Sequence, residues 1–102
     1  MENTQINLEQ ICMEIILYSG NARGFVLESM DYLKPRNEEK ITELMTLAKN
    51  ELNQAHQHQT ALLTAEASGK GAQTSVLLIH AQDHLMTTIT MRDLVEKLTE
   101  VL

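Results

Sequence analysis

The stretch Val76-Leu77-Leu78-Ile79-His80-Ala81-Gln82-Asp83-His84-Leu85-Met86-Thr87 places three groups that can titrate or bind a metal within an apolar run. On a helix with about 100° per residue, His80, Asp83 and His84 stand at i, i+3 and i+4 and share one face. The same arc also carries the apolar residues Val76, Leu77, Met91, Leu94, Val95 and Leu98. This period predicts a face in the core. Because burying an unpaired carboxylate is costly, we expect a partner for Asp83: a cation, hydrogen-bond donors or a neighbouring subunit.

The composition indicates a single all-α domain over residues 1–102. Hydrophobic residues make up 43% of the chain and aromatic residues 3%, with one Pro and no Trp, so we expect an aliphatic, Met-rich helical core. The net charge of −6 without a basic cluster argues against nucleic acid as a partner. No basic and apolar leader is present, and no stretch reaches the roughly 18 apolar residues of a membrane span. We therefore expect a soluble, cytoplasmic protein without membrane insertion.

Three long helices are predicted from the spacing of apolar residues and the positions of the breaks. The first begins near Gln5 to Asn7 and ends about Leu33, the second runs from Pro35 or Asn37 to Ala67, and the third runs from about Gln73 to Ser75 to the C-terminus. Because the breaks are short, we expect an antiparallel, up-down-up three-helix bundle. The first half of the third helix is apolar nearly all round, which indicates self-association.

Several single residues carry expectations of their own. Gly20 and Gly24 lie one turn apart, and we expect them to let another backbone approach closely; a turn that splits the first helix is the alternative. Cys12 lies in an apolar run and is expected to be inert packing. His56 and His58 are two residues apart and make a poor metal pair on a helix. We expect His58 on the solvated face and His56 turned toward the bundle.

The spacing of His80, Asp83 and His84 permits more than one chemistry. The three side chains can converge on a metal ion, although three ligands from one helix usually need a fourth from elsewhere. The histidines are plausible acid and base groups, but so small a bundle offers no evident pocket-forming loops. A histidine can also accept a phosphoryl group and pass it on. Hydrogen-bonded core histidines without a chemical role fit the spacing equally well.

Three segments resemble the lactose/cellobiose-type IIA component of the bacterial phosphoenolpyruvate-dependent sugar phosphotransferase system. They are the stretch Val76–Thr87, the apolar segment Ile15–Tyr18 followed by Ser19-Gly20-Asn21-Ala22-Arg23, and Leu52-Asn53-Gln54-Ala55-His56-Gln57-His58-Gln59-Thr60. The resemblance thus spans nearly the whole chain, and its strongest motif, His80-Ala81-Gln82-Asp83-His84, is specific.

The resemblance implies a three-helix subunit that assembles as a homotrimer. It implies that His80 accepts phosphate from the phosphohistidine of the phosphocarrier protein and passes it to a cysteine of the IIB component, for uptake of a β-linked disaccharide or glucoside through a IIC membrane permease. It further implies that Asp83 of three subunits shares one metal ion, expected to be Mg²⁺. His84 has a supporting role in this interpretation. Gln82 lies on the other side of the helix from His80 and is expected to be structural.

A second interpretation belongs to another functional class. In it, the chain is a non-catalytic helical oligomer whose His80 and His84 hold a structural metal. Phosphorylation of His80 by the phosphoenolpyruvate relay distinguishes the two.

Overall fold

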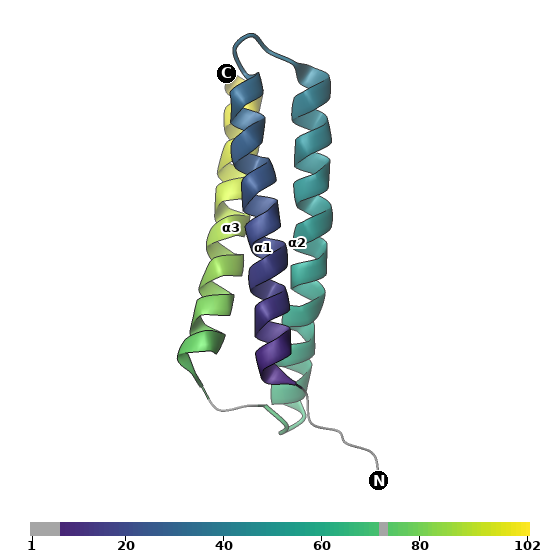
Figure 1. Cartoon of the computed structure of the whole chain (residues 1–102), viewed down its shortest axis with the longest axis vertical. Coiled ribbons are helices and arrows are strands. Elements are labelled where there is room, and N and C mark those ends of the chain that lie inside the picture. The colour runs from purple at the N-terminus through teal and green to yellow at the C-terminus, as the bar shows by residue number, and fades with distance from the viewer. Residues whose placement is uncertain (1–6, 72–73) are drawn as a thin grey trace.

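The computed structural model of the chain describes residues 7–71 and 74–102. Helix α1 spans Leu8–Ser29 and continues as a single 3-10 turn, η1, over Met30–Tyr32; α2 spans Glu38–Ala67 and α3 spans Val76–Val101. The prediction of three helices is confirmed, while the predicted starts at Gln5 and Gln73 lie outside the described residues. Figure 1 shows α1 and α3 running in one direction and α2 in the other. The molecule is a rod of 58 × 23 × 18 Å.

Each long helix begins at a residue whose side chain caps it. The Asn7 carboxamide oxygen accepts from the Gln10 amide at 3.0 Å, and the Asn37 carboxamide oxygen accepts from the Lys40 amide at 3.0 Å. The Ser75 hydroxyl accepts from the Leu78 amide at 3.1 Å. Asn and Ser are favoured at these positions because a short polar side chain satisfies an amide that has no partner inside the helix.

The connection between α1 and α2 is held against the end of α3. The Arg36 guanidinium donates from Nη2 to the carbonyl of Thr99 at 2.6 Å and from Nε to Glu38 at 2.6 Å. Thr99 lies in the last turn of α3, where carbonyls have no partner within the helix. Arg36 therefore links the α1–α2 connection to the C-terminal end of α3, and both lie at the top of Figure 1.

The core residues of the first two helices recur at helical spacing. The buried positions of α2 are Ile41, Leu44, Ala48, Leu52, Ala55, Leu62 and Ala65, and those of α1 are Cys12, Ile15, Ser19, Ala22, Val26 and Ser29. Cys12 is fully buried, which confirms its packing role, and burial raises the pKa of its thiol. Helix α1 runs unbroken through Gly20 and Gly24, so the alternative of a turn there is wrong.

The predicted core face of α3 is confirmed in the single chain at Val95, with Leu77 and Met91 packed against the core, and is wrong at several other positions of the face. Helix α3 packs mainly on α1 and touches α2 little. Its buried residues are Ala81, Leu85, Thr88, Val95 and Thr99. Val76 is 84% exposed and Leu94 59% exposed, and both His80 and Asp83 lie at the surface. Because the first half of α3 is apolar on nearly all sides, its periodicity did not distinguish the face toward α1 from the opposite face.

The glycines provide a paired test of the helix and turn conformations. A Cβ added at Gly24 meets nothing within 4 Å, so we expect Gly24→Ala to raise the free energy of unfolding by about 0.5–1 kcal/mol through helix propensity. Gly69 follows α2 with φ of +79°, a left-handed conformation, so Gly69→Ala should lower it by about 1 kcal/mol.

Urea unfolding of both variants checks this prediction. Destabilisation by Gly24→Ala would contradict it and would show that another chain packs closely against that position.

Candidate functional site

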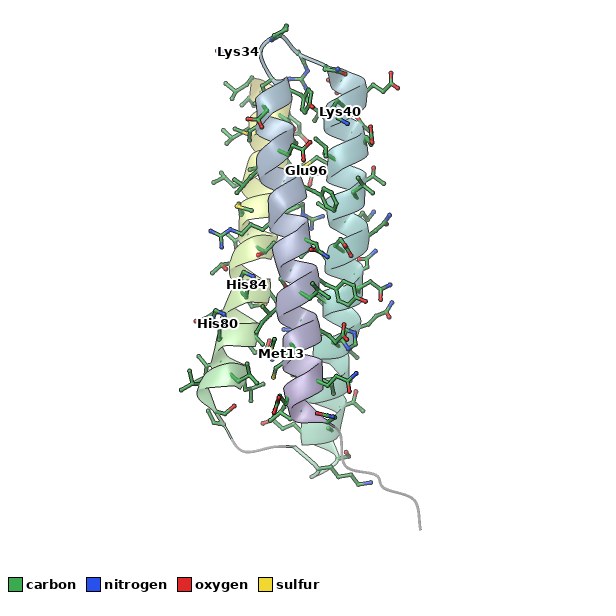
Figure 2. All side chains as sticks on the ribbon, viewed as in Figure 1. Met13, Lys34, Lys40, His80, His84 and Glu96 are labelled. Atoms are coloured by element: carbon green, nitrogen blue, oxygen red, sulfur yellow. The ribbon has the colours of Figure 1, made fainter. Side chains whose placement is uncertain are left out.

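His80 and His84 form a stacked pair on the lower half of α3. Their ring centroids are 5.7 Å apart and the ring planes differ by 15°. Figure 2 shows the two side chains one turn apart on the same helix. His80 is exposed, whereas His84 is partly buried. The predicted shared face is therefore present, and the more reachable of the two imidazoles is His80.

His84 lies where α1 and α3 come close together. A Cβ built on Gly20 of α1 would lie 3.5 Å from Nε2 of His84. This is an ordinary contact distance, and the neighbour is a side chain, which corrects the expectation that Gly20 and Gly24 admit another backbone within the single chain. A Cβ built on Gly24 would have no neighbour within 4 Å. Gly20 of the Ser19-Gly20-Asn21-Ala22-Arg23 segment is therefore a direct neighbour of His84, the second histidine of the pair.

The environment of His84 disfavours its protonated form. Burial, the neighbouring charge of His80 and the charge of Arg23 all lower the pKa of the His84 imidazole, with burial the largest cause. At neutral pH the stacked pair therefore does not need to accommodate two positive charges. A neutral imidazole at His84 is a polar but uncharged neighbour of His80.

Asp83 projects from the exposed surface of α3, next to the histidine pair. It belongs to a line of exposed residues that we call the outward stripe of α3: Val76, Ile79, Asp83, Met86, Leu94 and Val101. Because the carboxylate is exposed in the single chain, it carries no burial cost there, contrary to the expectation from the sequence. Its oxygens suit a hard cation such as Mg²⁺. Within residues 7–71 and 74–102, no three His, Cys, Asp or Glu side chains of one chain form a metal-holding group.

The other residues singled out in the sequence lie away from this site or play structural roles. Gln82 accepts a hydrogen bond from Nε2 of Gln59 on α2 at 2.8 Å, in agreement with its predicted structural role. His58 stacks on Tyr18 of α1 with centroids 5.8 Å apart, so the prediction of a solvated His58 is wrong. His56 is exposed, so its predicted turn toward the bundle is wrong as well. Both outcomes depend on a neighbouring helix that local spacing does not reveal.

Arg23 is a nearby residue for which no role was predicted from the sequence. It follows Gly20 by three residues on α1, its side chain is exposed, and its charge acts on His84. The available signal was its place in the Ser19–Arg23 segment, one helical turn beyond the glycine that contacts the histidine pair.

In the described part of the chain, no helix is long and apolar enough to cross a membrane.

Comparison with known proteins identifies the family. The family described as "PTS system, Lactose/Cellobiose specific IIA subunit" matches residues 10–102. The oligo-beta-mannoside-specific EIIA component of Bacillus subtilis is 34% identical over 101 residues, which cover 99% of this chain and 92% of the relative. The lactose-specific EIIA component of Streptococcus mutans is 41% identical over 88 residues, which cover 86% of this chain and 85% of the relative.

A solved structure agrees with these sequence matches. The crystal structure of the cellobiose-specific enzyme IIA from Bacillus anthracis superposes with a TM-score of 0.88 at 42% identity and covers 99% of this chain and 90% of that one. Fold and sequence agree over nearly the full length of the chain, and both place it with the proteins that its motifs resemble. The chain belongs to the lactose/cellobiose-specific IIA subunits of the sugar phosphotransferase system.

Proposed function

We propose that this chain carries a phosphoryl group on His80 between two partner proteins. The observation that supports this role most strongly is the exposed imidazole of His80, stacked on the partly buried His84, in a member of the IIA family. A carrier needs a nucleophilic nitrogen that large partners can reach, and it needs little other covalent machinery.

Each transfer exchanges one bond to phosphorus for another. An imidazole nitrogen of His80 attacks the phosphorus held by the phosphohistidine of the phosphocarrier protein, so that a new N–P bond forms as the donor N–P bond breaks. A cysteine thiolate of the IIB component then attacks the same phosphorus; an S–P bond forms and the bond to His80 breaks. Exclusion of water during docking prevents loss of the group as free phosphate.

The partner proteins, rather than this chain, bind and transport the sugar. Relatives are named for oligo-beta-mannoside, lactose and lichenan, and a solved relative for cellobiose. We assign to this chain the uptake of a β-linked disaccharide or glucoside through a IIC permease that it serves indirectly. It acts from the cytoplasm, where the phosphocarrier and the IIB component meet it.

The outward stripe of α3 supports a homotrimer. Val76, Ile79, Asp83 and Met86 follow one another at steps of three, four and three residues, the spacing of a coiled-coil seam. Val76 is 84% exposed and Met86 51% exposed in the single chain, which leaves apolar area unburied. Three copies of α3 packed along this seam bury that area and hold His80 at the edge of the seam.

Asp83 would then meet its two symmetry mates at the threefold axis. Three carboxylates in one place repel unless a cation or protons lie between them. Their oxygens are ligands of the type Mg²⁺ prefers, and bound water can complete its coordination. Such an ion would neutralise charge within the seam, and the phosphoryl transfer itself would proceed at His80.

The second candidate function is a non-catalytic helical oligomer with a structural metal site. The same seam and the same carboxylate favour it, because both describe assembly and neither requires chemistry at His80. The two candidates differ in what His80 does: the carrier needs its nitrogen for phosphate, whereas the oligomer needs it as a metal ligand.

Intact mass after incubation with phosphoenolpyruvate, enzyme I and the phosphocarrier distinguishes these functions. We expect one phosphate per chain on the wild type and none on His80→Gln. His56→Gln, which removes an exposed histidine from α2, is the matched control and should take up phosphate fully. An unmodified wild type beside a charged donor would reject the carrier and leave the structural oligomer.

The seam is tested by changing its charge. We expect Asp83→Leu to remain trimeric in sedimentation and to unfold at a higher temperature, because it removes three like charges and adds apolar area that offsets the lost ion. Met86→Asp adds three charges to the same seam and should shift the chain toward monomers. Monomeric Asp83→Leu together with trimeric Met86→Asp would show that this face of α3 is not the interface.

A further inference from the structure

The contact between α1 and α3 places a segment of α1 directly beside the histidine pair. Gly20 and His84 are neighbours across this contact, because a Cβ at Gly20 would lie 3.5 Å from Nε2 of His84. His84 in turn stacks on His80 with centroids 5.7 Å apart. The Ser19–Arg23 segment therefore contacts His84, and His84 contacts His80, the proposed phosphoryl acceptor.

Arg23 is the cationic side chain that this contact brings to the pair. Positions three residues apart on a helix are neighbours on its surface, so Arg23 lies one turn beyond Gly20 near the face of α1 that meets α3. Its charge reaches His84, where it is one of the causes of the lowered pKa of the imidazole.

The surroundings of Arg23 differ from those of the other arginines. Of the three arginines in the sequence, Arg36 pairs with Glu38 at 2.6 Å and Arg92 with Asp93 at 2.9 Å. Among the residues that the structure describes, Arg23 has no carboxylate within ion-pair distance. The exposed guanidinium of Arg23, whose charge acts on His84 next to the acceptor, thus has its hydrogen-bond donors available.

A phosphorylated His80 needs a cation of this kind. The phosphoryl group adds negative charge to a chain whose net charge is already −6, and Asp83 contributes a carboxylate on the same face of α3. Arg23 of α1 is a cation whose charge acts on this pair, at His84. A guanidinium presents a planar fork of donors that matches phosphate oxygens, and its charge strengthens each hydrogen bond.

We propose that Arg23 of α1 binds the phosphoryl group carried by His80 and so stabilises the phosphorylated form of the protein relative to the free form. This inference rests on the proposed function of His80. It assigns to the Ser19–Arg23 segment two contacts with the site: Gly20 packs against His84, and Arg23 binds the group that His80 receives.

The equilibrium of phosphoryl exchange tests this role. Phosphocarrier labelled on its histidine is freed of enzyme I and phosphoenolpyruvate and mixed with an equimolar amount of this chain. The ratio of phosphate on the two proteins is then measured at equilibrium. Docking contacts change the rate in both directions alike and leave this ratio unchanged, whereas a contact with the phosphoryl group shifts it.

We expect Arg23→Gln to lower the phosphorylated fraction of this chain relative to the carrier by about tenfold, the size of one charge-assisted hydrogen-bonding contact. Arg23→Lys keeps the charge without the fork and should give an intermediate ratio. Arg92→Gln is the control: it removes an arginine about 18 Å along α3 from His80, at 1.5 Å per residue, and should leave the ratio unchanged.

The outcomes separate this inference from the proposed function. A wild type that takes no phosphate from a charged carrier overturns both. A wild type that is phosphorylated, with Arg23→Gln giving the same ratio, overturns the role of Arg23 alone. Slower exchange in Arg23→Gln at an unchanged ratio also overturns it, because that result assigns Arg23 to docking.

Discussion

The packing of α3 on a single helix, α1, is the constraint on which the rest of the molecule depends. Ala81, Leu85 and Thr88 fill the contact, and α2 touches α3 little. If α3 were packed between both other helices, its apolar first half would be enclosed and the histidines would lie in a core. Because it packs on one side only, the opposite side remains exposed. His80 and Asp83 owe their accessibility to this arrangement.

The same contact sets the electrostatics of the histidine pair. His84 lies against Gly20 of α1, and its burial, with the charges of His80 and Arg23, lowers the pKa of that imidazole. A neutral His84 can stack on His80 without placing a second positive charge beside it. His80 remains exposed beside it, so one member of the pair is reachable and the other is held in place.

The sequence predicted the three helices because the evidence for them is local. The spacing of apolar residues and the short breaks marked the helices and their ends, and the buried positions of α2 follow one clear stripe. The inward face of α3 was predicted only in part: Val95 is buried, but Val76, His80 and Asp83 are exposed, since a helix that is apolar nearly all round has no single stripe. His58 was also misplaced because its partner, Tyr18, comes from a different helix.

The candidate site was predicted in a similar way. Helical spacing correctly placed His80, Asp83 and His84 on one face, but it did not show that this face lies at the surface of the single chain. Nor did spacing choose among metal binding, acid-base chemistry and phosphoryl transfer. The resemblance of three segments to the IIA family made that choice, and the family itself is confirmed. Arg23 escaped notice because its relation to the pair depends on the register between α1 and α3.

The central claim is that the phosphoryl group is carried on the imidazole of His80. The most direct measurement is nuclear magnetic resonance of the ¹⁵N-histidine-labelled chain after phosphorylation, read as coupling between ³¹P and an imidazole nitrogen. Of the four histidines in the sequence, we predict coupling at His80 alone, with a shifted resonance for His84. Coupling at His56, His58 or His84 instead, or phosphate without coupling to any histidine, would contradict the account.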